Sequence, residues 1–406
     1  MIRVVRVVTR LNVGGPTHHV TMLSGRLDRK RFQTLLVTGR PSPEEGNLTA
    51  EARRNAHVVV LPELSRQIHP WRDAVTWLRL MIVLLRFKPH IVHTHMAKAG
   101  ALGRSAAWVF NGLQRLRNRP RCRVLHTFHG HVWDGYFHPT VAWWFLVCER
   151  WLGKRTDRLI AINRSMERNL RERRIGRPER IIVIPLGLAL DSLQSLNGRC
   201  ASTDTGKRTW RIGIVGRLVP IKNHDLLFRG LYQLRVSSPE LSWTVDIVGD
   251  GALRFSLEET VRRLGLSDRV RFLGWQTRVT GVYGNLDLVC LTSNNEGSPV
   301  ALIESLAAAK PVLGTDVGGV GELLGGHCQS HEPFVVAPHG IVARPRDPDA
   351  IAAALRWAMT HPEEHAKTAT AGRQYVCATF NAERLLHDIS QLYQQLMSSE
   401  EETCTR

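Results

Sequence analysis

The sequence predicts an α/β protein built from two parallel, doubly wound sheets. Short apolar runs alternate with stretches long enough for helices in two successive series, which is the pattern of βαβ units. A polar, glycine-containing segment over residues 196–209 separates the series and indicates a linker. The length of 406 residues exceeds that of one ordinary domain. We therefore expect one domain over residues 1–195 and a second over residues 210–380.

Each element follows from local pattern. In the first series, apolar runs predict strands, and the stretches between them predict helices, one of which begins near His18. The expected strands are Val4–Thr9, Phe32–Thr38, Val58–Leu61 and His90–His93, and the other expected helices are Trp71–Phe87 and Ala97–Phe110. In the second series the expected strands are Arg211–Val215, Trp243–Val248, Val270–Gly274 and Leu286–Leu291, and the expected helices are Val300–Ala309, Ala350–Met359 and Ala382–Leu396. Asp347, directly before a helix, is expected to cap it rather than to bind a metal.

The apolar stretches and the cysteines of the chain indicate its cellular compartment. The start of the chain has no continuous apolar region of the kind that secretory signals carry, and the longest apolar stretch, Trp77–Phe87, is short and contains arginine. Seven cysteines without Cys-x-x-Cys spacing indicate reduced thiols. These observations predict a cytoplasmic protein without a disulfide framework.

The stretch Asp287–Glu322 holds the strongest functional signal. A buried strand, a polar loop and a helix with Pro299 at its first position follow one another, and this order directs backbone N–H groups toward the carboxyl edge of a parallel sheet. Glu296 in the loop and Glu304 in the helix can reach the same crevice, where carboxylates suit a vicinal diol such as that of a sugar. Either glutamate alone could equally be a solvated loop residue or a charge favoured by the helix dipole.

The run EGSPVALIE, followed by AAAKPVLGTDVGGVGEL, resembles the signature of family 4 retaining glycosyltransferases. The resemblance covers nearly the whole chain and implies the GT-B fold, two Rossmann-like domains that face each other across a cleft. It implies that Glu304 holds the ribose of the nucleotide and that Glu296 contacts the donor hexose. The backbone of Gly297, Ser298 and Pro299 would lie beside the sugar and the phosphates. It also implies that the C-terminal helix, residues 381–406, crosses back onto the first domain.

Two further motifs extend the resemblance. The run GRLVPIK matches the diphosphate clamp of the family and assigns that role to Arg217 and Lys222, whose cationic groups suit phosphates. The glycine loop NVGGPTHH implies that Gly15 faces the donor diphosphate. The chain departs from the family pattern at Asn163 and at residues 186–189, so the resemblance assigns no donor contact there.

The segment HTFHGH is expected to carry the histidine that touches the donor sugar. The best match is His129, and His131 is the second choice. A zinc site would also be conceivable among the histidines of this half, since imidazole is a common zinc ligand. We expect no metal, because no cysteine or carboxylate stands at ligand spacing, and the resemblance implies an enzyme that needs neither metal nor cofactor. The histidines considered for zinc are His93, His95, His126, His129 and His131.

The basic residues belong to the first half of the chain. Residues 1–200 contain 34 Lys and Arg and 13 Asp and Glu, which gives a net charge of +21. Residues 201–406 contain the remaining 21 basic and 23 acidic residues, which gives a net charge of −2. A solvated arginine-rich surface, a nucleic-acid face and a face toward anionic lipids are the three alternatives. Scattered arginines without interleaved aromatics argue against nucleic acid. The aromatic helices Trp71–Phe87 and Val141–Leu152 could pack in the core or lie in a membrane interface.

Together these observations predict a retaining hexosyltransferase. It would move a hexosyl residue from a nucleoside diphosphate sugar, with a UDP-sugar favoured, to an acceptor hydroxyl. The expected acceptor is a saccharide or a lipid-linked saccharide in cell-surface polysaccharide assembly. The expected location is the cytoplasm, with peripheral attachment to the inner face of the cell membrane. Two alternatives remain open: a nucleotide-sugar epimerase of the same fold, and a non-catalytic protein that binds the membrane surface.

Overall fold

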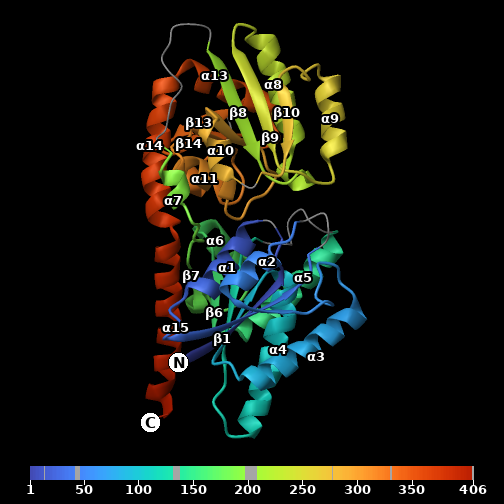
Figure 1. The fold of residues 1–406 in the computed structure, drawn as a ribbon, viewed down its shortest axis with the longest axis vertical. Coiled ribbons are helices and arrows are strands. Elements are labelled where there is room, and N and C mark those ends of the chain that lie inside the picture. The colour runs from blue at the N-terminus through green and yellow to red at the C-terminus, as the bar shows by residue number, and fades with distance from the viewer. Residues whose placement is uncertain are drawn as a thin grey trace. The chain divides into compact units, whose positions relative to one another are not determined.

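The computed structural model describes residues 1–12, 14–41, 46–130, 138–196, 208–276, 278–329 and 332–404. The chain forms two compact units (Figure 1). Unit 1 comprises Met1–Leu188 together with Ala382–Arg406, and unit 2 comprises Ala189–Asn381. Most of the expected linker, residues 197–207, lies outside the described part of the chain.

Unit 1 is built on a seven-stranded sheet in the order β3-β2-β1-β4-β5-β6-β7, and every neighbouring pair is parallel. Its strands are β1 (Ile2–Arg10), β2 (Phe32–Gly39), β3 (His57–Val60), β4 (Ile91–His95), β5 (Arg123–Phe128), β6 (Arg158–Ala161) and β7 (Ile181–Val183). The strand order reverses between β1 and β4, so the loops after these two strands diverge and leave a crevice at the carboxyl edge of the sheet. The predicted doubly wound sheet is confirmed.

Helices cover both faces of this sheet (Figure 1). They are α1 (Gly15–Arg26), α2 (Thr49–Asn55), α3 (Pro70–Phe87), α4 (Ala97–Leu116), α5 (Pro139–Lys154), α6 (Arg164–Glu172) and α15 (Ala382–Cys404). Successive residues of a strand point to opposite faces. Accordingly Val5 packs with the apolar side chains of α3 and α4, whereas Val4 packs with those of α1 and α15. The C-terminal helix therefore completes one core of unit 1.

Unit 2 repeats the architecture with a sheet in the order β10-β9-β8-β11-β12-β14-β13. Its strands are β8 (Thr209–Val215), β9 (Ser242–Val248), β10 (Val270–Gly274), β11 (Leu288–Leu291), β12 (Val312–Thr315), β13 (Phe334–Ala337) and β14 (Gly340–Ala343). Its helices are α7 (Asp191–Gln194), α8 (His224–Ser237), α9 (Arg254–Arg263), α10 (Val279–Gly284), α11 (Val300–Ala307), α12 (Val320–Leu324), α13 (Pro348–Thr360) and α14 (Pro362–Thr379). Only β13 is antiparallel to its neighbour among the described strands. The order reverses between β8 and β11.

The structure corrects two local predictions and adds one strand. Helix α1 begins at Gly15 rather than near His18, with Pro16 in its first turn. Pro299 is the N-cap of α11 and not its first residue. The segment before Pro338 contains strand β13, which pairs with β14 in a hairpin that the sequence pattern did not indicate. The predicted cap is confirmed, because the Asp347 carboxylate accepts hydrogen bonds from the backbone N–H groups of Asp349 and Ala350.

Within the described part of the chain, no helix combines the length and apolar content that a bilayer crossing requires.

Candidate functional site

In unit 2, the predicted donor-site residues gather where the strand order reverses. Arg217 and Lys222 follow β8, and Glu296 follows β11, the strand beside it. Because parallel strands end at the same edge of a sheet, the two loops meet there. Several hydrogen bonds tie the loops together: Asn294 N–H donates to the Ile221 carbonyl at 2.8 Å, Asn223 donates to the Asn294 side chain at 3.1 Å, and the Thr292 hydroxyl donates to the Asn223 carbonyl at 3.0 Å.

Lys222 and Glu296 form an ion pair at this edge. Lys222 Nζ lies 2.5 Å from Glu296 Oε1, and the Ser293 hydroxyl donates to the same oxygen at 2.6 Å. Both side chains are mostly shielded from solvent, with exposed fractions of 21% and 9%. Since both bonds go to Oε1, the second oxygen, Oε2, remains available to accept from a sugar hydroxyl.

The backbone of Gly318 and Gly319 lies against the backbone of Glu296 and holds it in place. Gly319 N–H donates to the Glu296 carbonyl at 3.2 Å. Gly318 has φ +53°, and a Cβ at this position would lie 1.9 Å from the Glu296 carbonyl oxygen. Only glycine fits both the dihedral angle and the space. The GlyGly pair after β12 thus fixes the loop that carries the carboxylate.

Arg217 lies on the same edge, half-buried after β8. Its guanidinium makes no ion pair with any residue that the structure describes. A planar guanidinium and an ammonium group therefore follow the same strand, and of the two only the ammonium pairs with a described carboxylate. This arrangement suits a ligand with two adjacent phosphates.

Glu304 lies on α11, and its partner was not predicted. The Tyr283 hydroxyl, from α10, donates to Glu304 Oε2 at 2.8 Å, and the Tyr283 side chain is fully buried. Loss of hydration raises the pKa of Glu304 to about 7, while the bond from Tyr283 opposes this rise. The carboxylate therefore changes its charge near neutral pH. Gly297, Ser298 and Pro299 lie between the two glutamates, immediately before α11.

Unit 1 places histidines from three elements together at the carboxyl edge of its sheet. His95 ends β4, His129 follows β5, and His19 lies on α1. His95 Nδ1 and His129 Nε2 lie 3.0 Å apart, and the ring of His19 packs edge-on against both. Both ring nitrogens of His19 and Nε2 of His95 are buried without a described hydrogen-bond partner. Gly15 begins the helix that carries His19.

These imidazoles are neutral at pH 7. Burial lowers the pKa of His129 to about 4. It also lowers the pKa of His19 and of His95 well below the usual value, and the cationic Arg6 acts in the same direction on both. Arg6 is fully buried on β1, where it contacts the Ser24 and Tyr393 hydroxyls.

The same three histidines are the group that could hold a metal ion within the described residues, since their ligand atoms lie within 4.8 Å of one another. The other histidines considered for zinc are engaged elsewhere: His93 bonds Tyr393 and Thr127, and His126 bonds Thr94. His131 lies outside the described part of the chain. Zinc would need a nearby carboxylate or water to complete four ligands.

Sequence reasoning missed His19, Tyr283 and Ser293. His18 and His19 are adjacent in the sequence, and only the position of the helix on the sheet decides that His18 is exposed and His19 buried. Tyr283 stands in a short apolar stretch that looks like ordinary core. Asn163, where the chain departs from the family pattern, caps α6 by accepting from Met166 N–H at 2.7 Å.

Both units of the chain match known protein families. Residues 14–187 match the profile of the glycosyl transferase 4-like domain, and residues 201–375 match that of the glycosyl transferases of group 1. A UDP-Gal:alpha-D-GlcNAc-diphosphoundecaprenol alpha-1,3-galactosyltransferase of Escherichia coli is 30% identical over 283 residues, which cover 68% of this chain and 70% of that protein. A D-inositol 3-phosphate glycosyltransferase of Salinispora tropica is 30% identical over 45% of this chain and 42% of its own length.

Solved structures share the fold at low identity. HepE of Anabaena, crystallised in complex with UDP, superposes with a TM-score of 0.72 at 19% identity, over 97% of this chain and 100% of that one. A sucrose-phosphate synthase of Thermosynechococcus elongatus superposes with a TM-score of 0.75 at 20% identity, over 98% and 100%.

Proposed function

Because this chain belongs to the group 1 glycosyltransferases with the GT-B fold, and so transfers a sugar from a nucleotide sugar, we propose that its donor is a UDP-hexose and that transfer retains the anomeric configuration. The observation that carries this proposal is the set of charged groups at the carboxyl edge of unit 2. Lys222 and Arg217 supply positive charge for a diphosphate, and Glu304 supplies an acceptor for a ribose diol. Uridine is favoured by the UDP-Gal donor named for the Escherichia coli relative and by the UDP complex of HepE.

The chemistry assigned to these groups is electrostatic. The bond between the hexose anomeric carbon and the leaving phosphate oxygen breaks, and a bond to the acceptor oxygen forms on the same face of the sugar. The acceptor's proton passes to an oxygen of the leaving diphosphate, which serves as the base. Arg217 and Lys222 stabilise the negative charge that develops on that diphosphate. No residue of the chain is assigned as a covalent nucleophile.

The remaining contacts position the hexose. Glu296 would accept from a hexose hydroxyl through Oε2, while Lys222 and Ser293 hold Oε1. His129, a neutral imidazole, would hydrogen-bond another hexose hydroxyl without adding charge. Backbone N–H groups near Gly15 and of Gly297 and Ser298 would approach the diphosphate, with the Pro299 backbone beside them. With two cations already assigned to the phosphates, no metal or other cofactor is required in this scheme.

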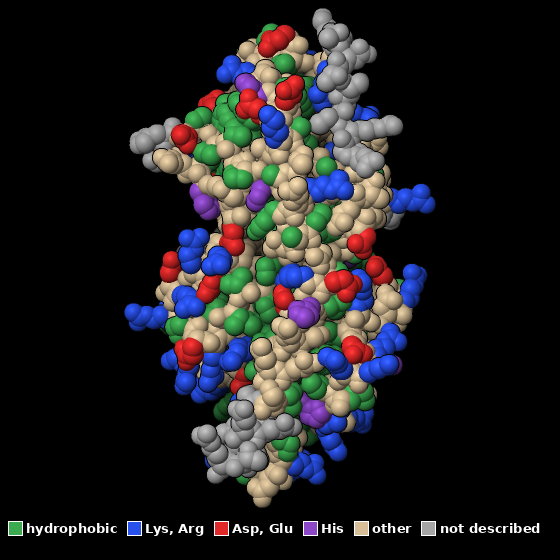
Figure 2. All heavy atoms as spheres, turned by 90° about the vertical axis from the view of Figure 1, so that its left-hand side faces the viewer, with side chains coloured by type: hydrophobic (Ala, Val, Ile, Leu, Met, Phe, Trp, Pro, Cys, Tyr) green, Lys and Arg blue, Asp and Glu red, His purple; other side chains and the backbone are tan. Residues whose placement is uncertain are grey.

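We further propose a lipid-linked saccharide as acceptor and an anionic membrane surface as partner of unit 1. The name of the Escherichia coli relative describes a diphosphoundecaprenol acceptor. Residues 1–200 carry a balance of +21, and Figure 2 shows Lys and Arg side chains spread over the unit 1 part of one face. Helix α3 buries Leu80 and Leu84 but exposes Trp71 and Ile82, which are 75% and 48% accessible. An exposed apolar face among basic residues suits a lipid interface.

Calorimetry with UDP, GDP and ADP in the presence of a chelator tests the donor assignment. We expect UDP to bind, and Glu304→Ala to weaken that binding at least 100-fold, while Glu240→Ala, an exposed glutamate of the same unit, binds normally. Unchanged affinity in Glu304→Ala would refute the ribose contact, and preference for another nucleotide would refute the UDP assignment.

Product analysis tests the reaction. NMR of the product formed from an α-linked UDP-hexose should show an α-glycoside of the acceptor. A β-glycoside would overturn retention. Formation of free UDP and an epimerised sugar, without a glycoside, would favour the epimerase alternative.

A further inference from the structure

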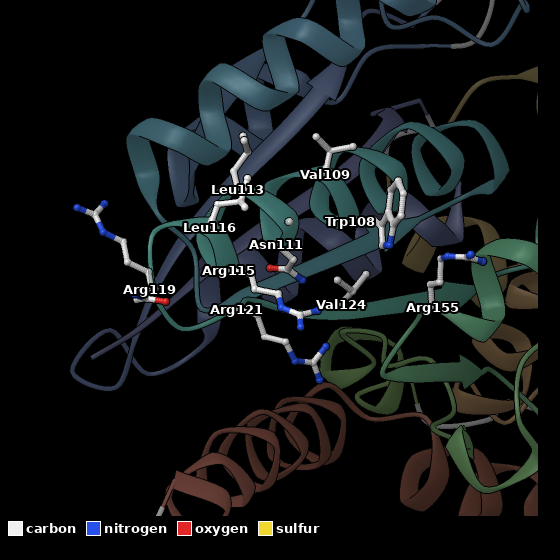
Figure 3. A pocket seen from close by; sticks show the side chains of 12 residues that line it. Trp108, Val109, Asn111, Leu113, Arg115, Leu116, Arg119, Arg121, Val124 and Arg155 are labelled. Atoms are coloured by element: carbon white, nitrogen blue, oxygen red, sulfur yellow. The ribbon is translucent and has the colours of Figure 1, made fainter.

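A groove on unit 1 lies far along the sheet from the histidine cluster. It has a volume of about 960 Å³ and is lined by the second half of α4, the loop after it, and the start of β5 (Figure 3). Val124, which lines it, is the second residue of β5, whereas His129 follows the carboxyl end of the same strand. The groove is therefore at the opposite edge of the sheet from the residues assigned to sugar transfer. A ligand here is neither the donor nor the reacting hydroxyl.

The groove combines apolar and cationic side chains. Trp108 and Leu116 of α4 are 50% and 83% accessible, although both are large apolar residues. Arg115, Arg119, Arg121 and Arg155 line the same hollow (Figure 3). This mixture of an exposed indole, an exposed leucine and several guanidinium groups is typical of a surface that meets lipid headgroups.

The charge of the groove is not balanced by acids. Arg115 and Arg119 make no ion pair with any described residue. Asp157, which pairs with the lining residue Arg121 at 2.7 Å, also accepts from the Val124 N–H at 2.8 Å. None of the described residues that line the hollow is acidic. Two guanidinium groups are thus left for an external anion.

The apolar wall continues along α5. The guanidinium carbon of Arg155 lies 4.0 Å from the ring centre of Trp151, and Trp151 packs edge-on against Trp108 at 5.7 Å. Farther along the same helix, Trp143 and Trp144 are 55% and 62% accessible. The stacked arginine and the indoles of Trp108 and Trp151 form one rim of the groove, and Trp143 and Trp144 add exposed indoles to α5.

We propose that this groove, bounded by Trp108, Leu116, Arg115 and Arg119, binds an anionic phospholipid of the bilayer. The lipid phosphate would contact Arg115, and Arg119, whose guanidinium points away from that of Arg115 in Figure 3, would meet a neighbouring headgroup. The upper part of an acyl chain would pack against Trp108 and Leu116. Arginine offers the planar fork that phosphate recognition uses. The proposal rests on the membrane partner proposed above and names where the lipid is held.

Vesicle sedimentation tests it with the full chain. We expect binding to phosphatidylcholine vesicles containing phosphatidylglycerol, and weak binding to phosphatidylcholine alone. The double variant Arg115→Gln/Arg119→Gln should lower binding to the anionic vesicles about tenfold or more. The matched control, Arg262→Gln/Arg263→Gln, removes two exposed charges from α9 of unit 2 and should change binding less than twofold.

Contact with the chain is tested by fluorescence. Brominated phosphatidylglycerol should quench tryptophan emission, and Trp108→Phe should remove part of that quenching while UDP binding by unit 2 stays normal. Normal UDP binding and an unchanged circular dichroism spectrum also exclude unfolding of the variants. Displacement of the protein from vesicles by millimolar glycerol phosphate would reassign the groove to a free phosphate ligand.

The outcomes separate the two proposals. If the protein does not bind anionic vesicles at all, the membrane partner itself is wrong. If it binds them and the Arg115/Arg119 double variant binds equally well, the membrane partner stands and the groove assignment is overturned. Preferential binding of the groove to RNA, measured with the same variant pair, would likewise overturn the lipid assignment.

Discussion

The two units carry seven-stranded sheets of the same kind, yet the carboxyl edges of these sheets differ in charge. In unit 2 the loops present the ion pair of Lys222 and Glu296, and α11 carries Glu304, which accepts from Tyr283 and changes its charge near neutral pH. In unit 1 the corresponding edge presents His19, His95 and His129, which burial keeps neutral. Charged groups suit a diphosphate, and neutral imidazoles suit hydroxyl groups. Under the proposed function, the two edges would therefore meet different parts of the donor.

The largest effect on activity should come from the carboxyl edge of the unit 2 sheet, with Lys222, Glu296 and Glu304, which we call the charged edge. The carboxyl edge of the unit 1 sheet, with His19, His95 and His129, is called the neutral edge. Lys222→Ala removes the ammonium group assigned to the leaving diphosphate, and we expect kcat to fall about 10²–10³-fold. Steady-state rates with a saturating UDP-hexose measure it. Lys367→Ala, an exposed lysine of the same unit, is the control and should leave kcat unchanged. A fall of less than threefold in Lys222→Ala would remove this residue from the mechanism.

The charged edge was the part that the sequence predicted best. Spacing around Glu296 and Glu304 places both at one sheet edge, because a strand, a loop and a helix in that order admit few arrangements. The ion pair between Lys222 and Glu296 was not foreseen, since the two residues are 74 positions apart and meet only through neighbouring strands. The position of β13 was also missed, because that strand is short and has no alternating pattern.

The neutral edge was predicted less well. The sequence indicated His129, but it gave no sign that His19 would join it, because burial of His19 depends on how α1 rests on the sheet. Arg6 is a second example. Arg6 lies within an apolar strand, and this position does not show which groups accept hydrogen bonds from its guanidinium. The acceptors are the hydroxyls of Ser24 and of Tyr393, which lies on α15. Contacts made by tertiary packing leave no local pattern in the sequence.

The next effect concerns pH. Ribose hydroxyls donate to the ionised form of Glu304, whose pKa is about 7, so UDP affinity should rise as pH increases from 6 to 8. Tyr283→Phe removes a hydrogen bond that lowers this pKa, so the midpoint should move to higher pH and affinity at pH 7 should fall about tenfold. Calorimetric titrations across this pH range measure both.

Two controls bear on the pH prediction. Tyr232→Phe, at an exposed tyrosine of the same unit, should leave the pH profile of the parent protein unchanged. Comparison of UDP with its 2′,3′-dideoxy analogue separates a ribose effect from a general loss of structure. If Tyr283→Phe weakens both nucleotides equally at every pH, Tyr283 supports the core and does not position Glu304.

A smaller effect is expected from the neutral edge. His129→Gln keeps a hydrogen-bonding side chain but changes its shape, and we expect kcat/KM for the UDP-hexose to fall about threefold to tenfold, which is the scale of one neutral hydrogen bond. Binding of UDP alone should not change, because UDP lacks the hexose. His57→Gln, at an exposed histidine of unit 1, serves as the control. An equal loss of UDP affinity would place His129 at the nucleotide instead of the sugar.

The smallest expected effect is that of metal removal. It tests most directly whether the histidine edge of unit 1 is neutral, as opposed to the charged edge of unit 2. Three histidine nitrogens close together could attract zinc, but the buried Arg6 cation acts on the same cluster and opposes a second positive charge there. We therefore expect EDTA to change neither UDP binding nor transfer, and elemental analysis of the purified protein to find no stoichiometric zinc. Should zinc copurify at one equivalent, His19→Asn ought to release it. Loss of transfer on that release would mean that the histidine edge binds a metal needed for catalysis, and the division into a charged and a neutral edge would have to be abandoned.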